Sequence, residues 1–120
     1  MSPKLTLQEI YDKATTGCIA QGGPAVDRGV CRLRAPFGRK CAVGHILPDE
    51  LYTPTLEGRA VLGCYDDPPQ FWASPLGIAL ATVVDPTPGV FSLLLDLQLA
   101  HDWSNDVEEM TRRFSKVTLQ

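Results

Sequence analysis

The chain has 120 residues, of which 44% are hydrophobic and 21% are charged, and its formal net charge is −3. This length and composition predict one compact globular domain over residues 1–120. No apolar run reaches the roughly 18 residues that a membrane-spanning helix needs, and the N-terminus lacks a signal-peptide pattern, so we expect a cytoplasmic protein without a membrane partner.

Residues 7–20 carry the clearest helix signal. Thr6 and Glu9 have the spacing of a capping box. Apolar residues then recur at helical spacing on one face, and Gly22-Gly23 marks the end of the helix.

Residues 29–44 predict a β-hairpin. Ala35-Pro36-Phe37-Gly38 supplies turn residues between the two arms. The period of two in a strand divides the arms into two faces. The inward face holds Cys31, Leu33, Cys41 and Val43, and the outward face holds Arg32, Arg34 and Lys40. In one register Cys31 lies opposite Cys41, as a thiol pair or a disulfide.

The middle of the chain predicts short elements. Residues 48–52 read as one helical turn, 55–62 as a short helix, and 64–74 as an acidic surface loop that ends in Phe71-Trp72. The apolar run 76–84 fits a helix or a strand, and Ser74-Pro75 in front of it favours a helix.

Two further helices are predicted near the C-terminus. The proline-rich segment 85–89 precedes a strongly apolar helix, and Asn105 is expected to cap an amphipathic final helix. We therefore expect an α+β fold, with a small antiparallel sheet at residues 29–44 packed against the N-terminal and C-terminal helices. The expected core contains Cys31, Leu33, Val43, Leu94, Leu95 and Leu99.

Catalysis is one candidate function. A thiol hydrolase needs a cysteine, a base and an orienting acid, and Cys41, His101 and Asp102 offer these groups. Cys41 is explained more simply as a small core residue, so we assign no catalytic residue and do not favour an enzyme.

Metal binding is a second candidate. Zinc ligands are available as Cys31, Cys41, His45 and Cys64, but they lack the short spacing of a zinc knuckle. We predict no metal site and no cofactor.

The basic face of the predicted hairpin is the strongest candidate for a binding site. Five of the eleven basic residues lie between Arg28 and Lys40, with no acidic residue among them, whereas the segment from Cys41 to Thr111 has eleven acidic residues and one basic one. The anionic remainder disfavours binding of duplex nucleic acid. An exposed aromatic flanked by arginines is typical of a binding surface. The candidate binding residues are Arg32, Arg34, Phe37, Arg39 and Lys40; the alternative is that these charges pair with the acidic surface of the same molecule.

Residues 39–52, Arg-Lys-Cys-Ala-Val-Gly-His-Ile-Leu-Pro-Asp-Glu-Leu-Tyr, with Glu57-Gly58 behind them, resemble a segment of small uncharacterised proteins from bacteriophages and prophages. Residues 5–13 and 97–102 resemble the same group. The resemblance implies a phage-type accessory protein that acts in the cytoplasm of a host bacterium.

In that setting we expect a binding protein that counters antiviral defence through a host defence protein or a small signalling nucleotide. For a nucleotide, the arginines would bind phosphate and Phe37, Tyr52 or Trp72 would stack on the base. Two alternatives stay open: a cysteine-dependent hydrolase or nucleotide-cleaving enzyme that uses Cys41 with His101 and Asp102, and a structural or morphogenetic phage component. Formation of a homo-oligomer also stays open.

Overall fold

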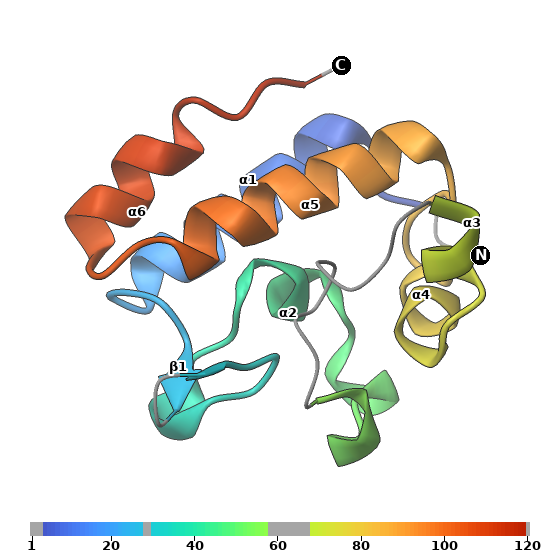
Figure 1. Ribbon diagram of the computed structural model, residues 1–120, viewed down its shortest axis with the longest axis horizontal. Coiled ribbons are helices and arrows are strands. Elements are labelled where there is room, and N and C mark those ends of the chain that lie inside the picture. The colour runs from blue at the N-terminus through green and yellow to red at the C-terminus, as the bar shows by residue number, and fades with distance from the viewer. Residues whose placement is uncertain (1–3, 28–29, 58–67, 120) are drawn as a thin grey trace.

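Helices form most of the chain in the computed structural model, which describes residues 4–27, 30–57 and 68–119, without the side chains of residues 26, 27, 30 and 31 (Figure 1). The α-helices are α1 (Leu7–Ala20), α2 (Ala42–Ile46), α3 (Pro68–Trp72), α4 (Pro75–Leu80), α5 (Pro88–Asp102) and α6 (Val107–Phe114). Three short 3-10 turns are η1 (Pro36–Gly38), η2 (Asp49–Leu51) and η3 (Pro54–Leu56).

The expected α+β fold with a hairpin over residues 29–44 is wrong. Extended pairing among the described residues is limited to the bridge Leu5–Val84 and a short antiparallel ladder between β1 (Val26–Asp27) and β2 (Val30–Cys31). In this ladder Cys31 pairs with Val26 and not with Cys41, and the predicted second arm is helix α2.

The second arm becomes a helix because side chains bind the backbone groups that a partner strand would have bound. The Gln98 side-chain oxygen accepts a hydrogen bond from the Val43 peptide N–H at 3.0 Å. The Cys41 sulfur accepts one from the Gly44 N–H at 3.3 Å, which makes Cys41 the N-cap of α2. The two arms still meet, since the Cys41 N–H donates to the Arg32 carbonyl at 3.2 Å.

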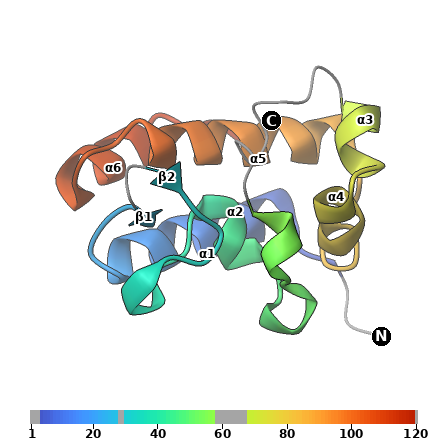
Figure 2. The same ribbon diagram turned by 60° about the horizontal axis from the view of Figure 1, so that its bottom comes forward.

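The helices pack around α1 and α5, which lie side by side (Figures 1 and 2). Helix α2 packs against both of them, and α6 packs against α5 and α1. Helices α3 and α4 form a pair near the N-terminal end of α5 (Figure 1). The loop 32–41, which replaces the predicted hairpin, leads into α2 and is thereby fixed to the helical core.

The predicted starts of two helices are confirmed. Thr6 and Glu9 form the capping box of α1, and Ser74 caps α4, which supports the helical interpretation of the apolar run up to Leu80. Helix α6 starts one residue later than predicted, because Asp106 rather than Asn105 accepts the hydrogen bond from the Glu109 N–H, at 2.8 Å.

The core prediction is correct in part. Leu33, Val43 and Leu94 are fully buried, Leu95 is half-buried, and Leu99 is wrong because its side chain is 43% exposed. Helix α5 instead turns Leu93, Leu94, Leu97, Gln98 and His101 inward.

Some predictions fall on other parts of the chain. The side chain of Cys31, the part of the predicted short helix beyond residue 57 and the part of the acidic loop at residues 64–67 lie outside the described residues. The remainder of that loop contains α3, whose Phe71 is fully buried.

Candidate functional site

The tip of the loop 32–41 presents Phe37 to solvent. Its side chain is 100% exposed, and its backbone has φ 65° and ψ 25°. Gly38 follows with φ 74°, and the Ala35 N–H closes the tip by donating to the Arg39 carbonyl at 2.8 Å. A left-handed backbone is unfavourable for a bulky residue, so this conformation is set by the closed turn and not by the preference of phenylalanine.

Arg34 binds other groups of the protein through its guanidinium. Its guanidinium donates to the carbonyl oxygens of Gly44 at 2.9 Å and Leu47 at 3.0 Å, and to the Asp49 carboxylate at 2.7 Å. It also lies 5.0 Å from the centre of the Tyr52 ring. These contacts join the loop to the C-terminal end of α2, where the free carbonyl groups of the helix need donors.

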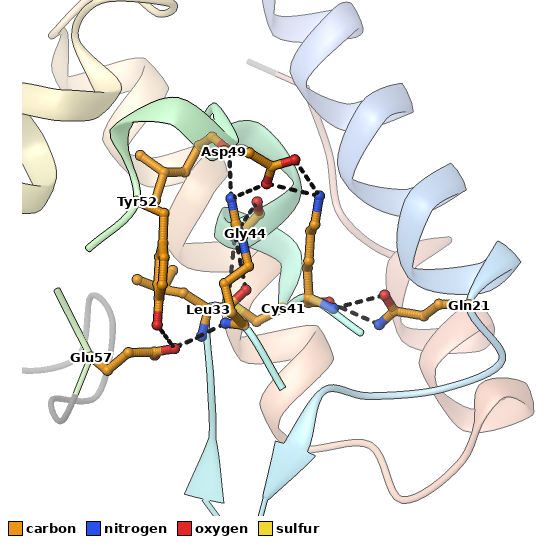
Figure 3. Close-up of polar contacts among 10 residues, drawn as sticks. Gln21, Leu33, Cys41, Gly44, Asp49, Tyr52 and Glu57 are labelled. Carbon is orange, nitrogen blue, oxygen red and sulfur yellow. Dashed lines mark hydrogen bonds and ion pairs between the residues drawn. The ribbon is translucent and has the colours of Figure 1, made fainter. Parts of the chain in front are cut away.

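Glu57 completes this cluster from the other side (Figure 3). Its two carboxylate oxygens accept the peptide N–H groups of Leu33 at 2.8 Å and Arg34 at 3.0 Å. The Tyr52 hydroxyl donates to the same carboxylate at 2.9 Å, and burial followed by this hydrogen bond raises the pKa of Tyr52. Glu57 had no predicted role, and its only sequence signal is its place behind residues 39–52, the segment that resembles phage proteins.

Some of the remaining predicted binding residues contact other groups of the same chain. Lys40 lies 3.2 Å from the Asp49 carboxylate, and the hydrogen bond and positive charge of Lys40, together with Arg34, lower the pKa of Asp49. Arg39 makes a longer contact with the Pro24 carbonyl at 3.4 Å. Arg32 is half-buried. The alternative that the basic residues pair with acidic groups of the same molecule therefore applies to Arg34 and Lys40.

Gln21 and His45 fix the second half of the loop. The Gln21 amide binds the peptide N–H and the carbonyl of Lys40 (Figure 3). Its oxygen also lies 2.9 Å from His45 Nε2, which acts as the donor. The His45 ring packs against Gly17 in α1. Burial and then the nearby cations Lys40 and Arg34 lower the pKa of His45 to about 4, so this histidine is neutral at pH 7.

His101 and Asp102 belong to an interior hydrogen-bond network. The fully buried His101 accepts the Ala25 N–H at Nε2, at 2.9 Å, and its Nδ1 donates to the Asp102 carboxylate at 2.8 Å. The same carboxylate accepts the Gln98 side-chain N–H at 2.7 Å, and Gln98 in turn caps Val43. Both ring nitrogens of His101 are occupied, so neither is available as a base for Cys41.

Burial suppresses the reactivity of both cysteines whose side chains are described. Burial and the nearby Asp102 carboxylate raise the pKa of the Cys18 thiol to about 12. Burial likewise raises the pKa of Cys41, whose sulfur is used as the N-cap of α2. Since the thiolate is the nucleophilic form, this geometry does not favour the hydrolase alternative.

Within the described ranges, no three histidine, cysteine, aspartate or glutamate side chains are grouped closely enough to hold a metal ion. Cys64 and the side chain of Cys31 lie outside those ranges. None of the helices described is both long and apolar enough to cross a membrane.

Comparison of the sequence with family models finds no match, and comparisons with curated proteins and with solved structures find no significant similarity. The resemblance of residues 39–52 to phage and prophage proteins therefore stays a prediction.

Proposed function

We propose that this chain is a phage-type accessory protein that acts in the cytoplasm of an infected bacterium and counters antiviral defence by binding a host protein. The phage setting follows from the resemblance of residues 39–52. The binding role is supported above all by Phe37, a fully exposed aromatic side chain on a left-handed residue.

The conformation of the tip supports a role in recognition. Holding a bulky residue in this backbone region costs about 1–3 kcal/mol, and a fully exposed ring recovers none of that cost by packing against the described part of the chain. Such strain is typical of functional positions. Because the turn is closed by the Ala35–Arg39 hydrogen bond, Phe37 is displayed before any partner arrives and binding loses little conformational entropy.

Charge around the tip favours a partner with an acidic surface. The loop carries four cations, Arg32, Arg34, Arg39 and Lys40, and two carboxylates bind to it: Asp49 pairs with Arg34 and Lys40, and Glu57 accepts peptide N–H groups. This set of residues therefore carries 4 − 2 = +2 charges. The chain as a whole carries −3, so the remainder carries −3 − 2 = −5. This polarity would orient the tip towards an acidic protein, with Phe37 entering an apolar pocket as an anchor.

The contacts of Tyr52 make a nucleotide site on this loop less suitable. Of the three rings expected to stack on a base, the Tyr52 ring already faces Arg34 and its hydroxyl donates to Glu57. Trp72 is half-buried, and Phe37 is 100% exposed, so no surface of the described residues encloses a base against its ring. A host protein therefore fits the tip better than a signalling nucleotide.

A photo-crosslinking experiment tests the proposal. A photoreactive phenylalanine analogue is placed at position 37, or at the matched exposed position Ile78, whose side chain is 61% exposed, and the protein is expressed in a defence-bearing bacterium. We expect one dominant crosslinked host protein from position 37 that is absent from position 78. The native protein should restore phage plating on this host. Phe37→Ser should abolish that effect, and Ile78→Ser should not.

Two results would contradict the proposal. One is crosslinking at position 37 only to further copies of this chain, together with large assemblies on a sizing column, which would support the morphogenetic alternative. The other is full restoration of phage plating by Phe37→Ser.

A further inference from the structure

A groove of about 600 Å³ runs between α5, α6 and the segment that follows α6. This size is within the usual range for small-molecule sites, which is roughly 300–1,000 Å³. Leu99, Ala100 and Val117 contribute apolar surface, and Trp103 contributes an aromatic ring. The residues that line the groove belong to α5, α6 and the segment after α6, and none of them belongs to the loop 32–41. Helices α5 and α6 lie apart from that loop in both ribbon views (Figures 1 and 2).

Trp103 is an unusual lining residue because its side chain is 68% exposed at the C-terminal end of α5. Leu99, one turn earlier on the same helix, is also exposed and lines the same hollow. The pair leaves apolar surface accessible on a helix whose other face is buried. A flat aromatic molecule could cover this surface by stacking on the indole ring.

The groove also holds positive charge that the protein does not neutralise. Arg113 pairs with Glu109 at 3.3 Å, and Glu109 also accepts the Asn105 N–H at 2.8 Å, so this charge pair is satisfied internally. Arg112 and Lys116, which are four residues apart, have no ion-pair partner among the described residues. Besides Glu109, the groove is lined by one further acidic residue, Asp96.

The helix dipole gives a simpler explanation for part of this charge. Basic residues in the last turn of a helix stabilise its C-terminus. That effect accounts for the presence of arginines at the end of α6, but it does not account for an exposed tryptophan or for a hollow beside them. The combination of ring and cations in one groove therefore points to a ligand.

We propose that this groove binds a small planar anion, namely an aromatic ring that carries a phosphate. The ring lies against Trp103 and Leu99, and the phosphate is bound by Arg112 and Lys116 through charge-assisted hydrogen bonds. A mononucleotide, in which a ribose joins the aromatic base to the phosphate, is a suitable probe for this class. The site goes beyond the proposed function, because it uses neither Phe37 nor the loop around it.

Nuclear magnetic resonance of the intact protein tests this site, since its two tryptophans give one indole N–H signal each. Adenosine monophosphate is titrated to about 10 mM, with adenosine and inorganic phosphate as separate probes. We expect a saturable shift of the Trp103 signal with the nucleotide, a much smaller shift of the half-buried Trp72, and weaker binding of either fragment. Trp103→Leu, followed through backbone signals of α6, should weaken binding roughly tenfold.

The charge is tested with Arg112→Gln/Lys116→Gln against the matched variant Lys4→Gln/Lys13→Gln, which removes two positive charges that do not line the groove. We expect at least a roughly tenfold loss in the first variant and less than about a twofold change in the second. The proposal is overturned if adenosine monophosphate does not shift the indole N–H signal of Trp103, or if inorganic phosphate alone binds as tightly as the nucleotide. It is also overturned if the two double variants bind the nucleotide with the same affinity. Phe37→Ser should leave nucleotide binding unchanged, which keeps this test independent of the host-protein proposal.

Discussion

The side-chain amide of Gln21 binds both peptide groups of Lys40, with Nε2 2.8 Å from the Lys40 carbonyl oxygen and Oε1 2.9 Å from the Lys40 nitrogen. A neighbouring strand would offer the same donor and acceptor to an extended residue. Gln21 therefore takes the place of the strand that the sequence predicted for this loop. Because Gln21 lies at the end of α1, the same contact ties the loop to the longest helix of the N-terminal half.

Gln21→Ala should destabilise the protein by about 2–3 kcal/mol. The substitution leaves the partly buried peptide groups of Lys40 and the ring of His45 without this partner, and each unsatisfied group costs on the order of 1–3 kcal/mol. Urea unfolding followed by circular dichroism measures the change. Gln8→Ala is the matched control, because Gln8 binds Asp12 on the exposed face of the same helix and its loss should cost less than about 0.5 kcal/mol. Equal losses in the two variants would contradict a structural role for the Gln21 contact.

Gly17→Ala should also destabilise the protein, although alanine normally stabilises a helix interior by about 1 kcal/mol relative to glycine. A Cβ atom at Gly17 would lie 2.7 Å from Cγ of His45 and overlap the imidazole ring. We expect a net loss of about 1–3 kcal/mol by thermal or urea unfolding. The control is Gly89→Ala in α5, where the nearest atom to an added Cβ is 4.0 Å away, and there we expect no loss of stability. A stabilised Gly17→Ala protein would show that α1 and α2 are not packed as closely as this.

The stability of the protein should fall between pH 6.5 and about pH 4 partly because of His45. Burial, followed by the charges of Lys40 and Arg34, lowers its folded-state pKa to about 4, whereas an unfolded histidine has a pKa near 6.5. Between these values the unfolded chain binds more protons than the folded one, so the free energy of unfolding falls as the pH is lowered. Chemical denaturation at pH 7 and pH 5 should therefore give a larger decrease for the native sequence than for His45→Gln. Carboxylates affect both proteins in the same direction, so the difference between the two decreases isolates His45, and identical decreases would contradict the assignment.

Cys18 and Cys41 should resist alkylation in the native protein at pH 7.5. Burial raises the pKa of both thiols, to about 12 for Cys18, so little thiolate forms and the sulfur atoms are not accessible. Brief treatment with iodoacetamide, followed by peptide mass spectrometry, should find both residues unmodified, and the same treatment in urea should modify them. Rapid alkylation of Cys41 in the native protein would instead support the alternative of a cysteine-dependent hydrolase.

Several helices were predictable because their signals are local. Thr6 and Glu9 stand three residues apart, and Ser74 precedes a proline at the first helical position, so the caps of α1 and α4 can be recognised within a few neighbouring residues. Helix α5 begins at Pro88, inside the segment 85–89 that was expected to precede it, because the Thr87 side chain caps the helix. Phe37 was also predictable as an exposed residue at a turn. The start of α6 was displaced by one residue because Asn105 and Asp106 are both good capping residues.

The error at residues 29–44 has a different origin. Alternating residues and a proline-glycine turn predict a hairpin, but the backbone of Lys40 and Val43 is bound by Gln21 and Gln98, which lie 19 and 55 residues away along the chain. The outward arginine at position 34 is likewise bound to carbonyl oxygens of α2 and to Asp49. No local pattern identifies such partners.

The sequence by itself determined which segments become the longer helices, where the positive charge is concentrated, and that Phe37 occupies a turn, because these properties depend on neighbours a few residues apart. Only the tertiary structure decided that the second arm is a helix, that Arg34 and Lys40 are tied to Asp49, that His101 is a buried acceptor, and that Trp103 shares a groove with Arg112 and Lys116. These outcomes depend on which distant side chain supplies a donor, an acceptor or a surface at a given point, and that is fixed only when the helices pack together.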